Sequence, residues 1–169
     1  RLAMARSNVP EATLLVADAL TPTSTADVLL ADPARRSDAG RIFRLDQLTP
    51  PLFELLTTYP GRALIVKCAP GLDHQMLRNR YGFDGEVQVT SLDGGVREAC
   101  LWTGPGVEPG RRATVLRTRA DGTLAEVEVT DREDDDVPAG EAGEWIVDPD
   151  GAIVRAGLVK HYARRSGLW

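Results

Sequence analysis

Cysteine, histidine and lysine are all scarce in this chain of 169 residues. Its two cysteines, Cys68 and Cys100, are too few for the disulfide framework that holds small secreted domains together. The two histidines do not stand at a spacing that would complete a zinc site with them, so we expect no metal. The composition therefore favours the reducing cytoplasm.

Long apolar runs are missing as well. No stretch approaches the ~20 apolar residues that a membrane-spanning helix needs, and no secretory signal is visible. We therefore expect no membrane partner.

Positive charge comes almost entirely from arginine. Lys67 and Lys160 are the only lysines, which leaves 18 of the 20 basic residues as Arg, and the formal net charge is −5. That balance argues against a surface that is basic throughout, although contact with nucleic acid depends on where the arginines lie. The sequence does not determine an oligomeric state.

The chain opens inside an apparent helix that runs to Asn8, with Arg1 as its first residue. Such an opening is typical of a chain that starts within a domain, so we expect a fragment of a longer protein.

Strands and helices alternate in the first part of the chain. Apolar runs at Thr13–Ala17, Asp27–Ala31 and Arg62–Cys68 predict buried strands, and Pro51–Thr58 predicts a helix. Near-continuous apolar runs are typical of strands that are covered on both faces. The alternation predicts an α/β fold with a parallel sheet.

A hairpin follows these elements. Glu86–Leu92 and Val96–Trp102 alternate with period two, and Asp93-Gly94-Gly95 between them is a strong turn signal. A parallel sheet that ends in an antiparallel hairpin is typical of Rossmann-like methyltransferases.

A change of composition after Gly104 predicts a boundary near residue 107. Residues 1–107 are assigned to the C-terminal part of a Rossmann-like sheet, and 108–169 to a small α+β accessory segment. In the second segment we expect strands over 111–118 and 123–129, a mobile acidic loop over 131–144, a strand over 145–147 and a helix over 152–165.

Each strand predicted in the first part carries a polar side chain at its end. These are Asp18, which precedes Ala19, then Asp32, which precedes Pro33, and then Lys67, which begins the run Lys67–Gly71. Because ligands of doubly wound sheets bind beyond the carboxyl ends of strands, we expect Asp18 and Asp32 to open onto one cleft. The alternative is structural, since an Asp after a strand also forms turns, and Arg35 and Arg36 could simply be solvated.

These residues carry a family resemblance. Asp32–Arg36, Lys67–His74, Ser91–Gly94 with Glu98–Ala99, and Trp145–Leu158 resemble, in this order, a bacterial family of class I S-adenosylmethionine-dependent methyltransferases. Members have a ferredoxin-like segment and a C-terminal THUMP-like domain. The likeness covers nearly the whole chain. It implies methyl transfer from S-adenosylmethionine, with RNA as the expected substrate.

The resemblance also implies roles for individual residues. Asp18, with Ala19, matches the acidic site that contacts the cofactor adenine. Asp32 and Pro33 match the motif beside the reacting methyl group, which makes Asp32 both a cofactor-binding and a catalytic candidate. The expected acceptor-binding residues are Arg35, Arg36, Lys67, Cys68, Pro70 and Gly71.

The chain departs from the family pattern in two respects. The glycine-rich cofactor loop is absent and would precede Arg1, so we expect the fragment itself to be inactive. In addition, Ala34-Arg35 replace the proline and aromatic residue common in amino-methylating enzymes. Two alternatives to an RNA methyltransferase stay open. One is a methyltransferase that acts on a protein or a small molecule, and the other is a non-catalytic binding domain.

Several polar or reactive residues have two interpretations. Cys68 could attack a pyrimidine ring, as in enzymes that methylate carbon 5, but packing is the favoured role of a cysteine at a strand end. Asp73 and His74 could act as acid and base, although capping of the next helix is favoured. The pairs Arg111-Arg112 and Arg164-Arg165 are interpreted as solvated surface, and Trp102 and Trp145 as core.

Overall fold

The computed structural model describes residues 2–35 and 48–169. Its elements are α1 (Leu2–Asn8), β1 (Val28–Ala31), β2 (Ala34–Arg35), β3 (Leu48–Thr49), α2 (Leu52–Thr58), β4 (Ala63–Cys68), α3 (His74–Tyr81), β5 (Glu86–Leu92), β6 (Gly95–Thr103), β7 (Gly110–Thr118), β8 (Leu124–Thr130), α4 (Gly151–Arg155) and α5 (Val159–Arg165).

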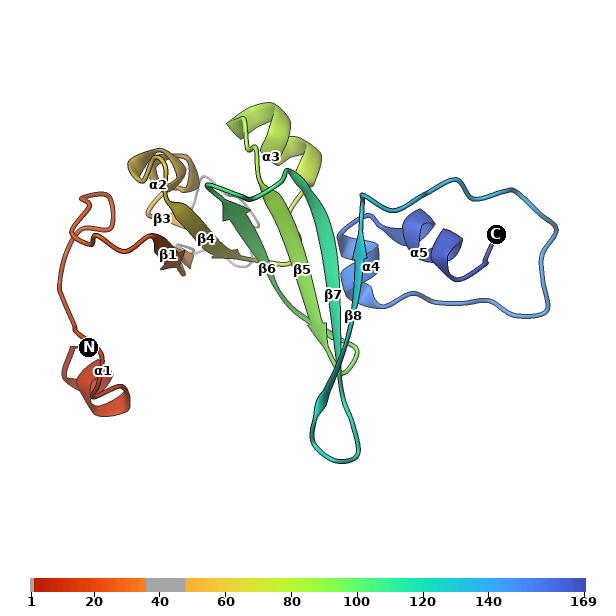
Figure 1. The fold of residues 1–169 in the computed structure, drawn as a ribbon, viewed down its shortest axis with the longest axis horizontal. Coiled ribbons are helices and arrows are strands. Elements are labelled where there is room, and N and C mark those ends of the chain that lie inside the picture. The colour runs from red at the N-terminus through yellow and green to blue at the C-terminus, as the bar shows by residue number, and fades with distance from the viewer. Residues whose placement is uncertain (1, 36–47) are drawn as a thin grey trace.

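A six-stranded mixed sheet with the order β1-β4-β6-β5-β7-β8 organises the chain (Figure 1). β1 runs parallel to β4, and β5 runs parallel to β7. β5 and β6 form the expected antiparallel hairpin, and β6 inserts beside β4. The predicted α/β class and the hairpin of β5 with β6 are therefore confirmed, although the sheet continues beyond this hairpin into β7 and β8.

One face of the sheet carries the core. In β4 the buried residues are Leu64, Val66 and Cys68, whereas the residues between them are more exposed, as the two-residue period of a strand requires. Leu52 and Leu55 of α2 and Leu77 of α3 pack in the same cluster. A second cluster places Ala152, Ile153 and Ala156 of α4 against Ala99, Ala113, Val115 and Val129.

The strands after residue 107 belong to the same sheet. β7 pairs with the whole length of β5, from Glu86↔Gly110 to Leu92↔Leu116. The division into two domains at residue 107 stays a prediction, and the sheet continues across that position.

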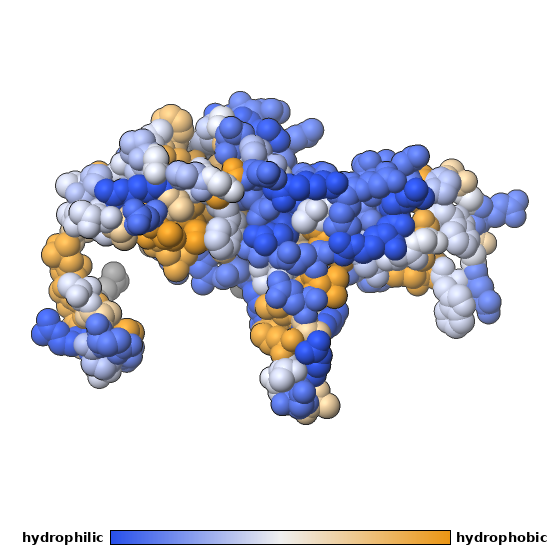
Figure 2. All heavy atoms as spheres, in the orientation of Figure 1, coloured by the Kyte–Doolittle hydropathy of each residue, from blue (hydrophilic) through white to orange (hydrophobic). Residues whose placement is uncertain are grey.

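The strand expected over residues 13–17 is wrong. This segment has no regular secondary structure, and its Leu15 and Val16 are 67% and 76% exposed. Figure 2 shows hydrophobic surface in orange along the segment that joins α1 to the rest of the molecule. An apolar run becomes a strand only where it finds a hydrogen-bonding neighbour and a face to cover. Here the segment instead connects α1, which lies away from the sheet, to β1 (Figure 1).

Two expectations near the C-terminus are also corrected. Residues 145–147 form no strand, and Trp145, expected in the core, is 82% exposed. The helix expected over 152–165 is divided into α4 and α5, because Gly157 between them has a φ of 70°, which lies outside the helical region.

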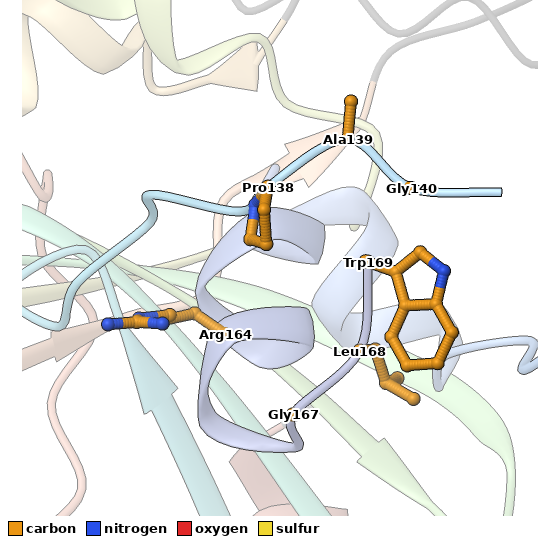
Figure 3. Close-up of a pocket in the computed structure, with 7 residues that line it drawn as sticks. All are labelled: Pro138, Ala139, Gly140, Arg164, Gly167, Leu168 and Trp169. Atoms are coloured by element: carbon orange, nitrogen blue, oxygen red, sulfur yellow. The ribbon is translucent and has the colours of Figure 1, made fainter.

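The acidic segment after β8 contains neither helix nor strand from residue 131 to residue 150. Arg164 lies 2.9 Å from a carboxylate oxygen of Asp134, and Arg165 pairs with Glu133. The acidic run therefore partly neutralises the positive charge at the end of α5. Trp169 closes this loop by donating to the Glu141 carbonyl at 2.7 Å, beside the small pocket drawn in Figure 3.

Candidate functional site

Asp32 is the first residue beyond β1, at the carboxyl end of a strand that runs parallel to β4. Its side chain is exposed, whereas Pro33 is buried. The proline ring fixes φ and so holds the backbone rigid next to the carboxylate.

A pocket of about 290 Å³ adjoins this strand end, and Asp32, Pro33, Ala19 and Tyr59 contribute to its lining. The remaining lining is largely apolar and includes Leu29, Leu30, Leu55 and Leu64. A flat apolar ring with a hydrogen-bond donor at its edge fits such a site, because the walls are apolar and the carboxylate accepts.

Tyr59 ties the segment before β1 to this pocket. Its hydroxyl donates to the Ala19 carbonyl at 2.5 Å. Asp18, by contrast, is exposed and uses a carboxylate oxygen to accept from the Leu20 amide at 2.9 Å, which forms a local turn. Ala19 and Asp32 thus line the same pocket. Asp18 is not among the residues that line it, and it lies in a local turn, not at the end of a strand.

Lys67 lies near the end of β4, on the face opposite the core. Its Nζ is 3.2 Å from Oε2 of Glu98 in β6. The hydrogen bond and the negative charge of Glu98, followed by the charge of Asp32, raise the pKa of Lys67. The hydrogen bond and the charge of Glu98 therefore stabilise Lys67 as a cation.

Cys100 lies directly across from Lys67 in the β4–β6 pairing. Its thiol lies 3.8 Å from Oε1 of Glu98. Burial, together with the charge of Glu98, raises the pKa of the Cys100 thiol to about 11. A thiol that stays protonated at neutral pH is a poor nucleophile.

Sequence reasoning selected Lys67 as a site residue but neither Cys100 nor Glu98. Glu98 lies 31 positions from Lys67 in the chain, and only the pairing of β4 with β6 brings the two together. Alternation along Val96–Trp102 shows which face Glu98 occupies, but the identity of the neighbouring strand is needed to find its partner.

The other expected acceptor residues are separated by the fold. Cys68 is 5% exposed and belongs to the core cluster, so its side chain points away from Lys67. This burial fits the packing role. Pro70 and Gly71 form the turn between β4 and α3, and Arg35 pairs with Leu48 of β3. Arg36 lies outside the described residues.

The capping interpretation of Asp73 is confirmed. Asp73 precedes α3, and its carboxylate accepts from the Met76 amide at 3.0 Å. The arginine pairs are not simply solvated. Arg111 lies 3.2 Å from Asp131, and Arg112 lies 2.7 Å from Glu86 and 2.9 Å from Glu128.

Two further observations concern residues 2–35 and 48–169. No cluster of three or more His, Cys, Asp or Glu side chains there has the arrangement of a metal site. None of the helices in these ranges has the length and apolar character needed to cross a bilayer.

The sheet order and its hairpin define a Rossmann-like methyltransferase fold. A solved structure from Porphyromonas gingivalis W83, described as a methyltransferase, shares this fold with a TM-score of 0.56 and 22% sequence identity. The match covers 82% of this chain and 36% of that one.

Relatives from two strains of Mycobacterium tuberculosis, CDC 1551 and H37Rv, are described as uncharacterized S-adenosylmethionine-dependent methyltransferases. Each is 48% identical to this chain over 173 residues, a match that covers 100% of this chain and 47% of the relative. The chain thus spans about half the length of these relatives. No known protein-family profile matches it.

Proposed function

We propose that this chain is part of a methyltransferase that uses S-adenosylmethionine and acts on RNA. The fold and the description of the Mycobacterium tuberculosis relatives support the methyl-transfer class. RNA as the acceptor is inferred from the domain pairing of the family that the sequence resembles. The observation that carries the proposal is the position of Asp32 and Pro33 at the end of β1, in one pocket with Ala19.

The residues of this pocket suit one end of the cofactor. Leu29, Leu30 and Tyr59 supply apolar surface for an adenine ring, and the Asp32 carboxylate is an acceptor for polar hydrogens. When bound, S-adenosylmethionine supplies an electrophilic methyl group on a sulfonium centre.

The protein contributes mainly by positioning the acceptor. The Asp32 carboxylate and the Pro33 carbonyl would accept hydrogen bonds from the acceptor nucleophile and direct its lone pair towards the methyl group. Lys67, fixed by its ion pair with Glu98, would help to shape the acceptor pocket. Correct alignment of two reactants is by itself a large part of catalysis, because it removes the entropic cost of bringing them together.

Replacing Asp32 tests this proposal in the natural full-length protein. We expect Asp32→Ala to lower transfer of labelled methyl groups to total cellular RNA by at least ~100-fold, the scale of one lost positioning or proton-accepting group. The matched control is Glu54→Gln, which removes a carboxylate from the exposed face of α2 and should leave the rate unchanged.

Three outcomes separate the alternatives. Label in RNA that depends on Asp32 supports the proposal. Label in a protein or small-molecule fraction assigns a different acceptor, and cofactor binding without any label indicates a binding domain. A wild-type rate in Asp32→Ala would remove Asp32 from the mechanism. Mass spectrometry of RNA from cells with and without the gene would identify the methylated nucleoside.

A further inference from the structure

A second, larger pocket of about 560 Å³ lies between α3 and the junction of α4 and α5. Its lining shares no residue with the pocket beside Asp32. The polar side chains that line it include His74 and Arg78 of α3, Arg111 of β7, Asp131 after β8, and Arg155 of α4. Three elements that are far apart in the sequence, α3, β7 and α4, therefore present three arginines and a histidine to one cavity.

Arg111 forms one wall and is held rigidly. Its Nε donates to Asp131 at 3.2 Å, and its Nη1 donates to the carbonyl oxygens of Ala156 and Gly157 at 3.3 and 3.2 Å. These contacts join β7 to the end of α4. The guanidinium thus enters the cavity in a fixed orientation, with its charge only partly offset by Asp131.

Arg78 and Arg155 differ from Arg111 in their ion pairing. Within residues 2–35 and 48–169, neither guanidinium has a carboxylate within salt-bridge distance. Of the two acids at this pocket, Asp131 is paired with Arg111 and Asp73 caps α3. The cavity therefore holds more positive than negative charge, and it does so in a protein whose net charge is −5.

His74 adds an unsatisfied polar group. Its Nε2 is buried and has no hydrogen-bond partner. Burial, followed by the charges of Arg111 and Arg78, lowers the pKa of His74. A buried nitrogen without a partner beside surplus cationic charge is a costly arrangement, and an anion in the cavity would relieve it.

We propose that this pocket binds a phosphate group. Arg guanidinium groups bind phosphate oxygens through paired, charge-assisted hydrogen bonds. The cavity is larger than one phosphate and falls in the usual size range of small-molecule sites, so the group would be carried by a larger molecule. An RNA strand and a free nucleotide present the same chemistry.

Calorimetric titration of this chain with inorganic phosphate and with pyrophosphate tests the site. We expect binding by the wild-type chain and a loss of about tenfold in affinity in Arg155→Gln and in Arg78→Gln, which corresponds to one charge-assisted contact each. Both residues are exposed, so neither variant should impair folding. Arg80→Gln, an equal charge change on α3 outside this lining, is the matched control and should bind normally.

Competition then identifies the source of the phosphate. A single-stranded RNA that displaces pyrophosphate in a salt-dependent manner indicates an RNA backbone site, whereas displacement by mononucleotides alone indicates a nucleotide site. Either result supports the proposal. Absence of binding by the wild-type chain, or equal binding by wild type and both variants, would overturn it. Methyl transfer dependent on Asp32 is measured separately, so failure here leaves the proposed function intact.

A pH series with sulfate gives a second readout, because the charge of sulfate does not change near neutrality. The charged groups that face His74 are Arg111, Arg78, Asp131 and Asp73. A bound anion would raise the pKa of His74, so binding should take up a proton and strengthen as the pH falls from 7 to ~5.5. His74→Gln should abolish that dependence, and a dependence unchanged in this variant would contradict the role of His74.

Discussion

Asp93, in the turn between β5 and β6, accepts two hydrogen bonds from Thr118 at the end of β7. The Asp93 carboxylate lies 2.7 Å from the Thr118 amide and 2.8 Å from its hydroxyl. The two residues come from opposite sides of the predicted boundary at residue 107. The turn of the hairpin is thereby fixed to the strand that follows it in the sheet.

The first prediction concerns Asp93→Asn. The Thr118 amide, and then its hydroxyl, lower the pKa of the Asp93 carboxyl. A lowered pKa in the folded state contributes stability that is present above the unfolded value, 3.8, and is lost as the pH falls through the folded value. Asn tolerates the positive φ of 51° at this position but carries no charge.

Urea unfolding at pH 7 and pH 3 measures the effect. We expect Asp93→Asn to be less stable than the wild type at pH 7 and the difference to shrink at pH 3. An equal difference at both pH values would show that the charge of Asp93 does not contribute.

A second prediction follows from the position of Glu98 between Lys67 and Cys100. Because Glu98 helps to raise the pKa of the Cys100 thiol, Glu98→Gln should lower that pKa from about 11 and increase the thiolate fraction. Alkylation of Cys100 at pH 8.5, followed by peptide mass spectrometry, should therefore be several-fold faster in the variant. Glu126→Gln on β8 is the matched control and should leave the rate unchanged. If alkylation is no faster in Glu98→Gln, burial alone raises the pKa of the Cys100 thiol.

Two glycines with positive φ give a third, comparative prediction. At Gly104, with φ 114°, an added Cβ would lie 2.3 Å from the Arg62 carbonyl oxygen. At Gly122, with φ 81°, an added Cβ would have nothing within 4 Å. We expect Gly122→Ala to cost about 1 kcal/mol, because only backbone strain is added. Gly104→Ala should cost more than about 3 kcal/mol, because strand backbone must also move. Thermal denaturation of both variants checks the order, and similar melting temperatures would contradict the close approach at Gly104.

A fourth prediction tests the core. Leu101 in β6 is fully buried in the cluster that packs α2 and α3 on the sheet. Leu101→Ala should lower the free energy of unfolding by about 2 to 5 kcal/mol, the usual cost of a buried Leu-to-Ala cavity. Leu124→Ala, the same change at a residue that is 53% exposed, should cost less than about 0.5 kcal/mol. Denaturant unfolding compares the two, and equal losses would place Leu101 outside the core.

Local patterns in the sequence predicted most of the sheet. The alternation over β5 and β6 with the intervening Asp93-Gly94-Gly95, and the apolar run of β4, identify strands whose sides are fixed by the two-residue period. The same logic failed at residues 13–17 and 145–147. Both runs are short and apolar, and neither has a neighbouring strand among the described residues with which to pair.

The candidate site was only partly predictable. Asp32 and Pro33 follow a strand in the sequence itself, which is why they could be selected. Ala19 reaches the same pocket without a preceding strand, through a hydrogen bond from Tyr59, 40 residues away. The group formed by Arg78, Arg111 and Arg155 has no sequence signature, since each residue taken alone is an ordinary surface arginine.

The sequence by itself determined which segments of this protein alternate as strands, where the hairpin turns, and that a carboxylate and a proline follow β1. Only the tertiary structure decided that β6 lies between β4 and β5, that Glu98 meets Lys67, and that three arginines surround one cavity. The physical reason is that periodicity and turn chemistry act over a few residues. Strand order and register, in contrast, are set by which distant surfaces bury each other, and no local pattern encodes that choice.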